Sequence, residues 1–381
     1  METKQMEESG VEVFDEKFEN FYSKVESIAT KNHDYVVSMS DVHMVDGIVR
    51  IPDVGEYRLS NRALQQFSYT LGIYTPYVKK MRDKGAYDLM EYNFNYWMKK
   101  SEKKAILLRT NGKTVNAVLS PRYKAIDNLA ILNIVRDTFM KSNVNLKFHK
   151  GMMYDGNVYL QFMDPQKTIY LEPEEKEDVY QFGVAIQNSE VGEHSFEVEE
   201  YIYREVCTNG MMVKYGGYDD KWFHIGGKKT NFDYSNDPQY IKESNKTLDE
   251  IKKALEKPAN MEYRESAMDA LRKLKRKSVS DPDNFAKALK QYFMLSDKDV
   301  EIINKVREGD TYYDWLQAIT RTANYYTNEA ESKSVKKRID FEKFGGLLMS
   351  DDGKIWGHLE LVTKDYALKD KKKNDEDEDK E

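Results

Sequence analysis

The feature that most constrains this fold is a change in the spacing of its apolar residues past the middle of the chain. Between residues 105 and 213, apolar and β-branched side chains recur mainly at every second position, the period of a β-strand with one buried face. After residue 247 they recur at every third or fourth position, the period of an amphipathic α-helix. The sequence therefore predicts the α+β class, with an antiparallel sheet core, flanking helices and a helical C-terminal region.

Two turns that contain glycine place the first strands. Residues 105–110 and 113–119 are apolar runs joined by Asn111-Gly112, a dipeptide that favours the tight turn of a β-hairpin. Asp155-Gly156 lies at the centre of a second predicted hairpin over residues 145–163. The next two strands are expected to pair through one apolar face, formed by Tyr180, Phe182, Val184, Ile186, Phe196, Val198, Ile202 and Val206.

Start and stop signals place helices on both sides of these strands. Ser60 is the predicted N-cap of a helix that ends at Gly72, and Asp127 is predicted to cap a helix after the first hairpin. Other helices are predicted within the first 35 residues, from Thr75-Pro76, and over 86–100, 248–256, 261–276 and 312–329. Two more are predicted over 282–293, with Asp281 as the cap, and over 297–307, with Ser296 as the cap.

The length and the distribution of charge divide the chain. A chain of 381 residues exceeds the usual size of one compact core, so more than one domain is expected. The polar stretch 230–246, which includes Pro238, is the predicted boundary, and the last residues form a like-charged run that is expected not to pack. The predicted divisions are an N-terminal extension (1–50), an α+β domain (51–235), a helical region (236–363) and a disordered acidic tail (364–381).

Several classes of protein are excluded by absent signals. The single cysteine, Cys207, excludes an internal disulfide and a thiolate zinc cluster, and among apolar neighbours it is read as a small buried residue. No secretory leader and no run of about 18 apolar residues is found, so a cytoplasmic protein without a membrane partner is expected. The histidines have no ligand spacing and the glycine-rich nucleotide signatures are missing, so no metal and no cofactor is predicted.

Several ordered segments together resemble one family, the prokaryotic and phage group titled phage/plasmid-like protein, domain of unknown function 932. The resemblance spans about residues 50–350 and implies a protein of mobile elements in the cytoplasm of a host cell, with no defined activity to transfer. The matching segments are Leu59 to Leu64 with Gly72-Ile73, Ala117 to Tyr123 with Asp127-Asn128, Asn188 to Gly192, Tyr203 to Met211, and Trp315 to Ala323.

The leading functional hypothesis is binding of single-stranded DNA in recombination or replication. A net charge of −7 argues against binding through global charge, but basic residues beside aromatic ones can track phosphates while the rings stack on bases. The alternative for these residues is a solvated helix face. The candidate binding residues are Lys79, Lys80, Arg82, Trp97, Lys100, Arg272, Lys273, Lys275 and Arg276.

The second hypothesis is an enzyme whose polar residues converge from several loops. Glu190 would act as a general base, and Arg122 and Arg204 would hold an anion. The structural alternative is a set of turn residues and a buried ion pair, since Asn188 and Arg204 are expected at opposite ends of a strand pair. The candidate catalytic residues are Arg122, Asp127, Asn188, Glu190, Arg204 and Asn209.

A third hypothesis is a host-interaction or antidefence protein, which rests on the family resemblance alone. It names a host protein as the partner, and the sequence is also compatible with a homo-oligomer.

Overall fold

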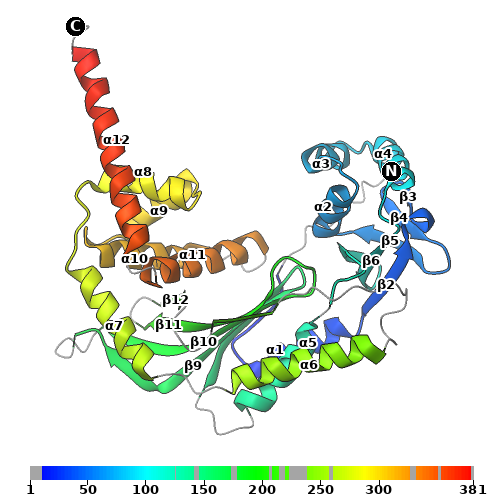
Figure 1. The fold of residues 1–381 in the computed structure, drawn as a ribbon, viewed down its shortest axis with the longest axis horizontal. Coiled ribbons are helices and arrows are strands. Elements are labelled where there is room, and N and C mark those ends of the chain that lie inside the picture. The colour runs from blue at the N-terminus through cyan, green and yellow to red at the C-terminus, as the bar shows by residue number, and fades with distance from the viewer. Residues whose placement is uncertain are drawn as a thin grey trace.

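The computed structural model describes residues 11–124, 126–140, 146–172, 178–205, 208–213, 219–222, 238–256, 261–326, 332–350 and 353–378. In these residues the chain forms two mostly antiparallel sheets with helices packed on them, and a group of helices follows (Figure 1). The predicted α+β class is confirmed.

The large sheet is built from hairpins. Its strand order is β1-β8-β9-β10-β11-β12, and β13 also pairs with β11. Asp155 and Gly156 take φ angles of 48° and 73°, as the tight turn between β8 and β9 requires, so the second predicted hairpin is confirmed. The strands are β1 (Val11–Asp15), β8 (Lys147–Tyr154), β9 (Asn157–Tyr170), β10 (Val179–Ser189), β11 (Phe196–Arg204), β12 (Asn209–Val213) and β13 (Asp219–Trp222).

Residues 32–119 form a second body, called here the N-terminal unit. Its sheet has the order β2-β6-β7-β5-β4-β3, antiparallel except for the β5–β7 pair, and Asn111-Gly112 forms the predicted turn between β6 and β7. Phe67 and Phe94 meet edge to face in its core at 5.3 Å between ring centroids. Its elements are β2 (Asn32–Ser38), β3 (His43–Val45), β4 (Ile48–Ile51), β5 (Gly55–Leu59), α2 (Asn61–Thr70), α3 (Thr75–Asp83), α4 (Tyr87–Lys100), β6 (Ala105–Asn111) and β7 (Thr114–Leu119).

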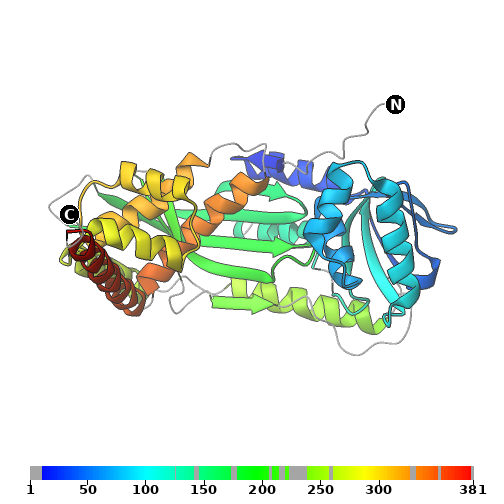
Figure 2. The same cartoon turned by 90° about the horizontal axis from the view of Figure 1, so that it is seen from above.

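Helices cover both faces of the large sheet. On one face, α1 (Phe18–Ala29), α5 (Asn128–Val135) and α6 (Pro238–Leu255) bury an apolar core that includes Phe21, Phe162 and Val184 (Figure 1). α5 continues into one π-helical turn, Arg136–Met140. On the other face, α11 (Ser332–Ser350) packs on β12, and seen from above the middle strands lie between α11 and the N-terminal unit (Figure 2).

The C-terminal helices form the third part of the molecule, at the end opposite the N-terminal unit (Figures 1 and 2). Asp281 and Ser296 cap α8 and α9 through their side chains, as predicted. Phe285 packs against Trp315 and Trp356 in the core of this group. The helices are α7 (Met261–Lys275), α8 (Pro282–Tyr292), α9 (Asp297–Val306), α10 (Tyr312–Thr322), followed by a 3-10 turn (Ala323–Tyr325), and α12 (Lys354–Glu378).

Some element boundaries differ from the sequence predictions. α6 begins at Pro238, inside the stretch predicted as a linker, because proline suits the first turn of a helix. α10 ends at Thr322, earlier than predicted, and Phe14 lies in β1 rather than in a helix. The strands β2 to β4 occupy part of the predicted N-terminal extension.

The predicted tail also differs from the structure. α12 continues to Glu378, and its residues beyond Lys364 contact α8: the Tyr366 hydroxyl donates to Gln291 at 2.8 Å and Lys287 pairs with Asp370 at 2.9 Å. Helical structure therefore extends past the point at which the sequence predicts disorder. Residues 379–381, Val206 and Cys207 lie outside the described residues.

Candidate functional site

The loop after β10 is held by side chains from the N-terminal part of the chain. Four consecutive backbone carbonyls, one from the last residue of β10 and three from this loop, each accept a hydrogen bond from a different side chain. The contact is called here the joint, because it connects the large sheet to the N-terminal unit. Its hydrogen bonds run from Tyr123 Oη to Ser189 O (2.8 Å), Arg109 Nη1 to Glu190 O (3.4 Å), Gln66 Nε2 to Val191 O (2.7 Å) and Arg62 Nη2 to Gly192 O (3.5 Å).

The Glu190 side chain reaches back across the joint. One carboxylate oxygen accepts from the backbone N–H of Asn128 at 2.6 Å, and the other accepts from the Asn32 amide at 3.3 Å. Asp127 occupies the N-cap position of α5, as predicted, but its side chain makes no hydrogen bond to the helix. The free N–H at the start of α5 is therefore satisfied by Glu190, a residue distant in sequence.

Arg109 lies at the centre of the joint. Its Nε and Nη2 atoms bind the two carboxylate oxygens of Asp34 at 2.8 and 2.7 Å, and Nη2 lies 3.0 Å from Asp127. Burial raises the pKa of Glu190 to about 7; the charges of Asp127 and Asp34 act in the same direction, and that of Arg109 opposes them. One guanidinium thus faces three carboxyl groups.

Asn188 completes the joint from inside the large sheet. The residue is fully buried, and its amide donates to the Ile126 carbonyl at 2.6 Å and to the Asn128 side chain at 2.8 Å. Asn128 in turn donates to the Gly156 carbonyl at 3.2 Å. These bonds connect the end of β10 to the start of α5 and to the β8–β9 turn. Asn188 therefore has a structural role.

Arg204 and Asn209 belong to a different cluster. Arg204 lies opposite Tyr180 on β10, and Tyr180 is eight positions from Asn188, which corresponds to about 26 Å along a strand. Arg204 pairs with Asp178 at 2.5 Å, and Asn209 donates to Gln317 at 3.1 Å. The structure therefore brings Asp127, Asn188 and Glu190 together but separates them from Arg204 and Asn209. Arg122 is exposed, and its backbone N–H binds Ser120 Oγ at 3.2 Å.

Sequence reasoning missed Arg109 and Asp34. The available signal is the charge of Arg109 inside the otherwise apolar run 105–110, because a charged residue at a buried strand position needs a partner. A second missed cluster lies under α11, where Glu342 accepts from Tyr159 at 2.5 Å and from Gln161 at 3.1 Å.

The predicted basic residues of α4 lie on an exposed helix face. Tyr92, Tyr96 and Trp97 are 67%, 45% and 46% exposed. Tyr92 stacks on Tyr96 with 6.1 Å between centroids, and Tyr96 meets Trp97 edge to face at 5.3 Å. Two exposed lysines follow in the last turn of the helix. The aromatic–basic surface is defined as Tyr92, Tyr96, Trp97, Lys99 and Lys100.

The other predicted basic residues are less available or distant. On α3, Lys80 is exposed and Lys79 is half-buried, while the guanidinium of Arg82 binds Asn61 and Asp83. On α7, Arg272 donates to the Leu171 carbonyl at 2.8 Å and pairs with Asp269 at 2.8 Å. Lys275 is half-buried, and Lys273 and, just after the helix, Arg276 are exposed. α7 and α4 lie at opposite ends of the molecule (Figure 1), so the two groups do not share one groove.

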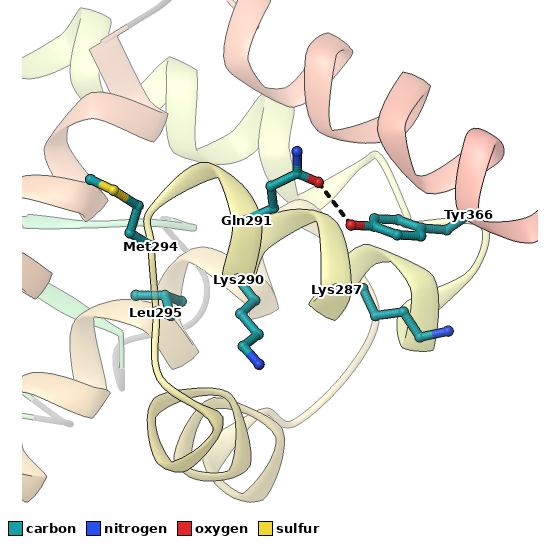
Figure 3. Close-up of a pocket in the computed structure, with 6 residues that line it drawn as sticks. All are labelled: Lys287, Lys290, Gln291, Met294, Leu295 and Tyr366. Carbon is teal, nitrogen blue, oxygen red and sulfur yellow. Dashed lines mark hydrogen bonds between the residues drawn. The ribbon is translucent and has the colours of Figure 1, made fainter.

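A shallow hollow of about 540 Å³ lies between α8 and α12 (Figure 3). The ammonium group of Lys287 is paired with Asp370, and that of Lys290 with Asp297. None of the predicted site residues lines this hollow. Its lining consists of Lys287, Lys290, Gln291, Met294, Leu295 and Tyr366.

The described residues contain neither a metal-binding cluster nor a helix that could span a membrane. No group of three or more His, Cys, Asp or Glu side chains there is arranged to hold a metal ion. Among the helices of the same residues, none has the length and apolar character of a membrane span.

Comparison with known proteins agrees with the sequence motifs. No curated protein and no solved structure matches the chain. A family model described as Domain of unknown function (DUF932) matches residues 115–342, more than half of the chain. This range contains the joint loop, the Arg204 and Asn209 cluster and most of the C-terminal helices, whereas the aromatic–basic surface lies outside it. The chain therefore belongs to the DUF932 family.

Proposed function

We propose that the chain binds single-stranded DNA through the aromatic–basic surface of α4. The observation that carries the proposal is a row of three exposed rings, in which Tyr96 contacts both Tyr92 and Trp97, just before two exposed lysines. Unpaired bases stack on exposed aromatic rings, each contributing about 1–3 kcal/mol, and lysines neutralise the adjacent phosphates. A duplex hides its base faces, so the surface favours single strands.

The alternative explanation of this surface is a protein interface. Isolated exposed aromatics are ordinary, but three in mutual contact form a patch of the kind that binds a partner. The lysines favour a partner with regularly spaced negative charge over an apolar protein surface. The net charge of −7 means that such binding depends on this local surface rather than on the whole molecule.

The enzymatic hypothesis receives less support from the geometry. Five of its six candidate residues fall into two clusters about 26 Å apart along β10, and the sixth, Arg122, is exposed. Glu190 is buried with both carboxylate oxygens hydrogen-bonded. Host interaction remains a hypothesis that copurification from host lysate would test.

Fluorescence anisotropy with labelled single-stranded and duplex DNA of equal length, at about 50 and 200 mM salt, tests the proposal. We expect preferential, salt-sensitive binding of the single strand. Replacing Tyr92, Tyr96 and Trp97 with alanine should weaken it at least about tenfold, the effect of losing about 1.4 kcal/mol of stacking. Replacing Lys99 and Lys100 with alanine should lower the slope of log affinity against log salt by about 1.4.

Tyr325→Ala is the matched control, because Tyr325 is also exposed and lies beside a lysine, Lys305, at 6.0 Å. It should leave binding unchanged. Binding should also quench the fluorescence of Trp97, and this quenching should be absent from the triple alanine variant, which keeps Trp222, Trp315 and Trp356. No binding by the wild-type chain at low salt would remove the proposal. A triple variant that keeps its DNA affinity but changes from oligomer to monomer would identify the surface as a protein interface.

A further inference from the structure

The joint contains more acidic than basic groups. Asp34, Asp127 and Glu190 face the single guanidinium of Arg109. The side chains of Asp34 and Asp127 are 35% and 56% exposed and contact Arg109 directly, whereas Glu190 is only 4% exposed. Solvent can therefore stabilise the charges of the two aspartates but not that of Glu190.

The carboxylate of Glu190 forms hydrogen bonds only with uncharged groups among those described. Its two carboxylate oxygens accept from a backbone N–H and from a side-chain amide, which are both neutral donors. Arg109 uses Nε and Nη2 for the aspartates and directs Nη1 to the backbone carbonyl of Glu190. A buried carboxylate with neutral partners and two nearby acids is the group of the three that gains most from taking up a proton.

We propose that the joint responds to protons: it is tightest when Glu190 is protonated, and ionisation of Glu190 weakens the hold of the N-terminal unit on the large sheet. In the tight state the carboxyl group needs no solvation, and the Arg109 guanidinium is shared by two aspartates instead of three acids. In the loosened state the carboxylate reaches water. This inference does not depend on the proposed DNA binding, although the joint also holds the unit that carries the aromatic–basic surface.

The direction of the effect follows from linkage. Burial raises the pKa of Glu190 to about 7, against about 4.3 for a glutamate in an unfolded chain. The tight state therefore binds the proton more strongly than the loosened or unfolded state. Its stability rises as the pH falls from about 7 toward about 4.3, and it is lost as the pH rises through about 7.

The groups that face Glu190 come from every element around it. Asn32 and Asp34 lie on β2, Arg109 on β6, Tyr123 after β7, and Asp127 and Asn128 at the start of α5. Burial raises the pKa of Tyr123, so this hydroxyl keeps its proton throughout the neutral range and continues to donate to Ser189.

The test compares thermal unfolding of the full chain and of Glu190→Gln between pH 5.5 and 8.5. Glutamine is a neutral isostere of the protonated side chain. We expect the melting temperature of the variant to rise relative to that of the wild type between pH 5.5 and pH 8.5, and the variant to melt about 2–4 °C or more above the wild type at pH 8.5. The proposal would be overturned if the variant melted below the wild type and the difference in melting temperature were larger at pH 8.5 than at pH 5.5.

A second variant keeps the test decisive if Glu190→Gln folds poorly. Asp127→Asn changes a side chain that is 56% exposed and removes one of the charges that raise the pKa of Glu190. The pH at which stability falls should therefore move to a lower value. An unchanged pH profile would count against the proposal.

Glu193→Gln provides a control with the opposite sign in the same loop. Burial of Glu193 is outweighed by its hydrogen bond to Lys336 and by the charge of that lysine, so the pKa of Glu193 is lowered. Its ionised form stabilises the fold, so the substitution should lower the melting temperature at neutral and alkaline pH, and this effect should fade as the solution becomes acidic enough to protonate Glu193 in the folded protein.

Hydrogen exchange locates the effect at the joint. Peptides that cover the start of α5 and the loop after β10 should lose protection between pH 6 and 8 in the wild type, after correction for intrinsic rates. The same peptides should not change in Glu190→Gln, and peptides from β4 and β5 should not change in either protein. Equal loss of protection across all peptides would contradict a local effect.

Discussion

Arg109 is the single residue on which most contacts of the joint depend. Its side chain is buried, and it binds two carboxylates and a backbone carbonyl from three segments of the chain. We expect Arg109→Met to reduce the free energy of unfolding by about 3–5 kcal/mol, because it leaves three acids without their cation. Urea unfolding at pH 7 measures this loss, and the loss should be smaller at pH 5.5, where Glu190 is protonated.

Arg50→Met is the matched control for this substitution. Arg50 also forms an ion pair in the N-terminal unit, with Glu56 at 2.9 Å, but both side chains are exposed. Such a pair contributes about 0–1 kcal/mol. Similar losses from the two variants would mean that Arg109 acts as an ordinary surface charge.

For single residues, the sequence predicts which residue occupies a helix N-cap better than it predicts that residue's hydrogen-bond partners. Asp127 occupies the predicted N-cap position, yet the hydrogen bond to the helix comes from Glu190. Ser60 both occupies its predicted position and accepts from Ala63, three residues on. The two cases differ in the separation of the partners along the chain. The Ser60 cap depends on residues next to each other in sequence, whereas the Glu190 contact depends on how the large sheet and the N-terminal unit pack together.

Among the elements, α11 approaches the backbone of β12 closely at a glycine. A Cβ atom added to Gly346 would lie 1.4 Å from the backbone oxygen of Met212. Backbone cannot move aside as a side chain can, so Gly346→Ala should displace α11 and cost at least about 2 kcal/mol of stability. Thermal or urea unfolding measures this change.

Gly357→Ala is the control for this helix substitution. Gly357 lies in α12, and a Cβ atom there would meet nothing within 4 Å. Alanine is the better helix former by about 1 kcal/mol, so this variant should be slightly more stable than the wild type. Destabilisation by both substitutions would show that glycine is needed for its backbone conformation and not for space.

The elements that the sequence predicted are those with local signals. The hairpins at Asn111-Gly112 and Asp155-Gly156 follow from turn chemistry, and α8 and α9 follow from their caps. The missed strands β3 to β5 have only three to five residues, and β2 finds its partner β6 only after about 70 intervening residues. α11 was not predicted because its apolar side chains do not gather on one helix face.

Over the whole molecule, the large sheet separates the two polar clusters that the sequence proposed as one site. The joint lies at one end of β10, and the Arg204–Asp178 pair lies at the other, beneath the C-terminal helices. Alternating spacing predicted the strand pair and so allowed the separation to be anticipated. The pattern could not predict that the Asn188–Gly192 segment binds the N-terminal unit.

The separation predicts how substitutions combine. Arg109→Met and Arg204→Met each break an ion pair, but the two arginines share no partner and act at opposite ends of β10, where Asn188 and Tyr180 lie about 26 Å apart along the strand. Their losses in free energy of unfolding should therefore add to within about 0.5 kcal/mol.

By contrast, Arg109→Met and Asp127→Asn act on the same contact, and the second removes a charge that the first leaves unpaired. This double variant should be more stable than the sum of its single changes by at least about 0.5 kcal/mol. Urea unfolding of the two double variants and their parents, followed by circular dichroism, measures both terms. Strong coupling between Arg109 and Arg204 would show instead that the two clusters act as one unit.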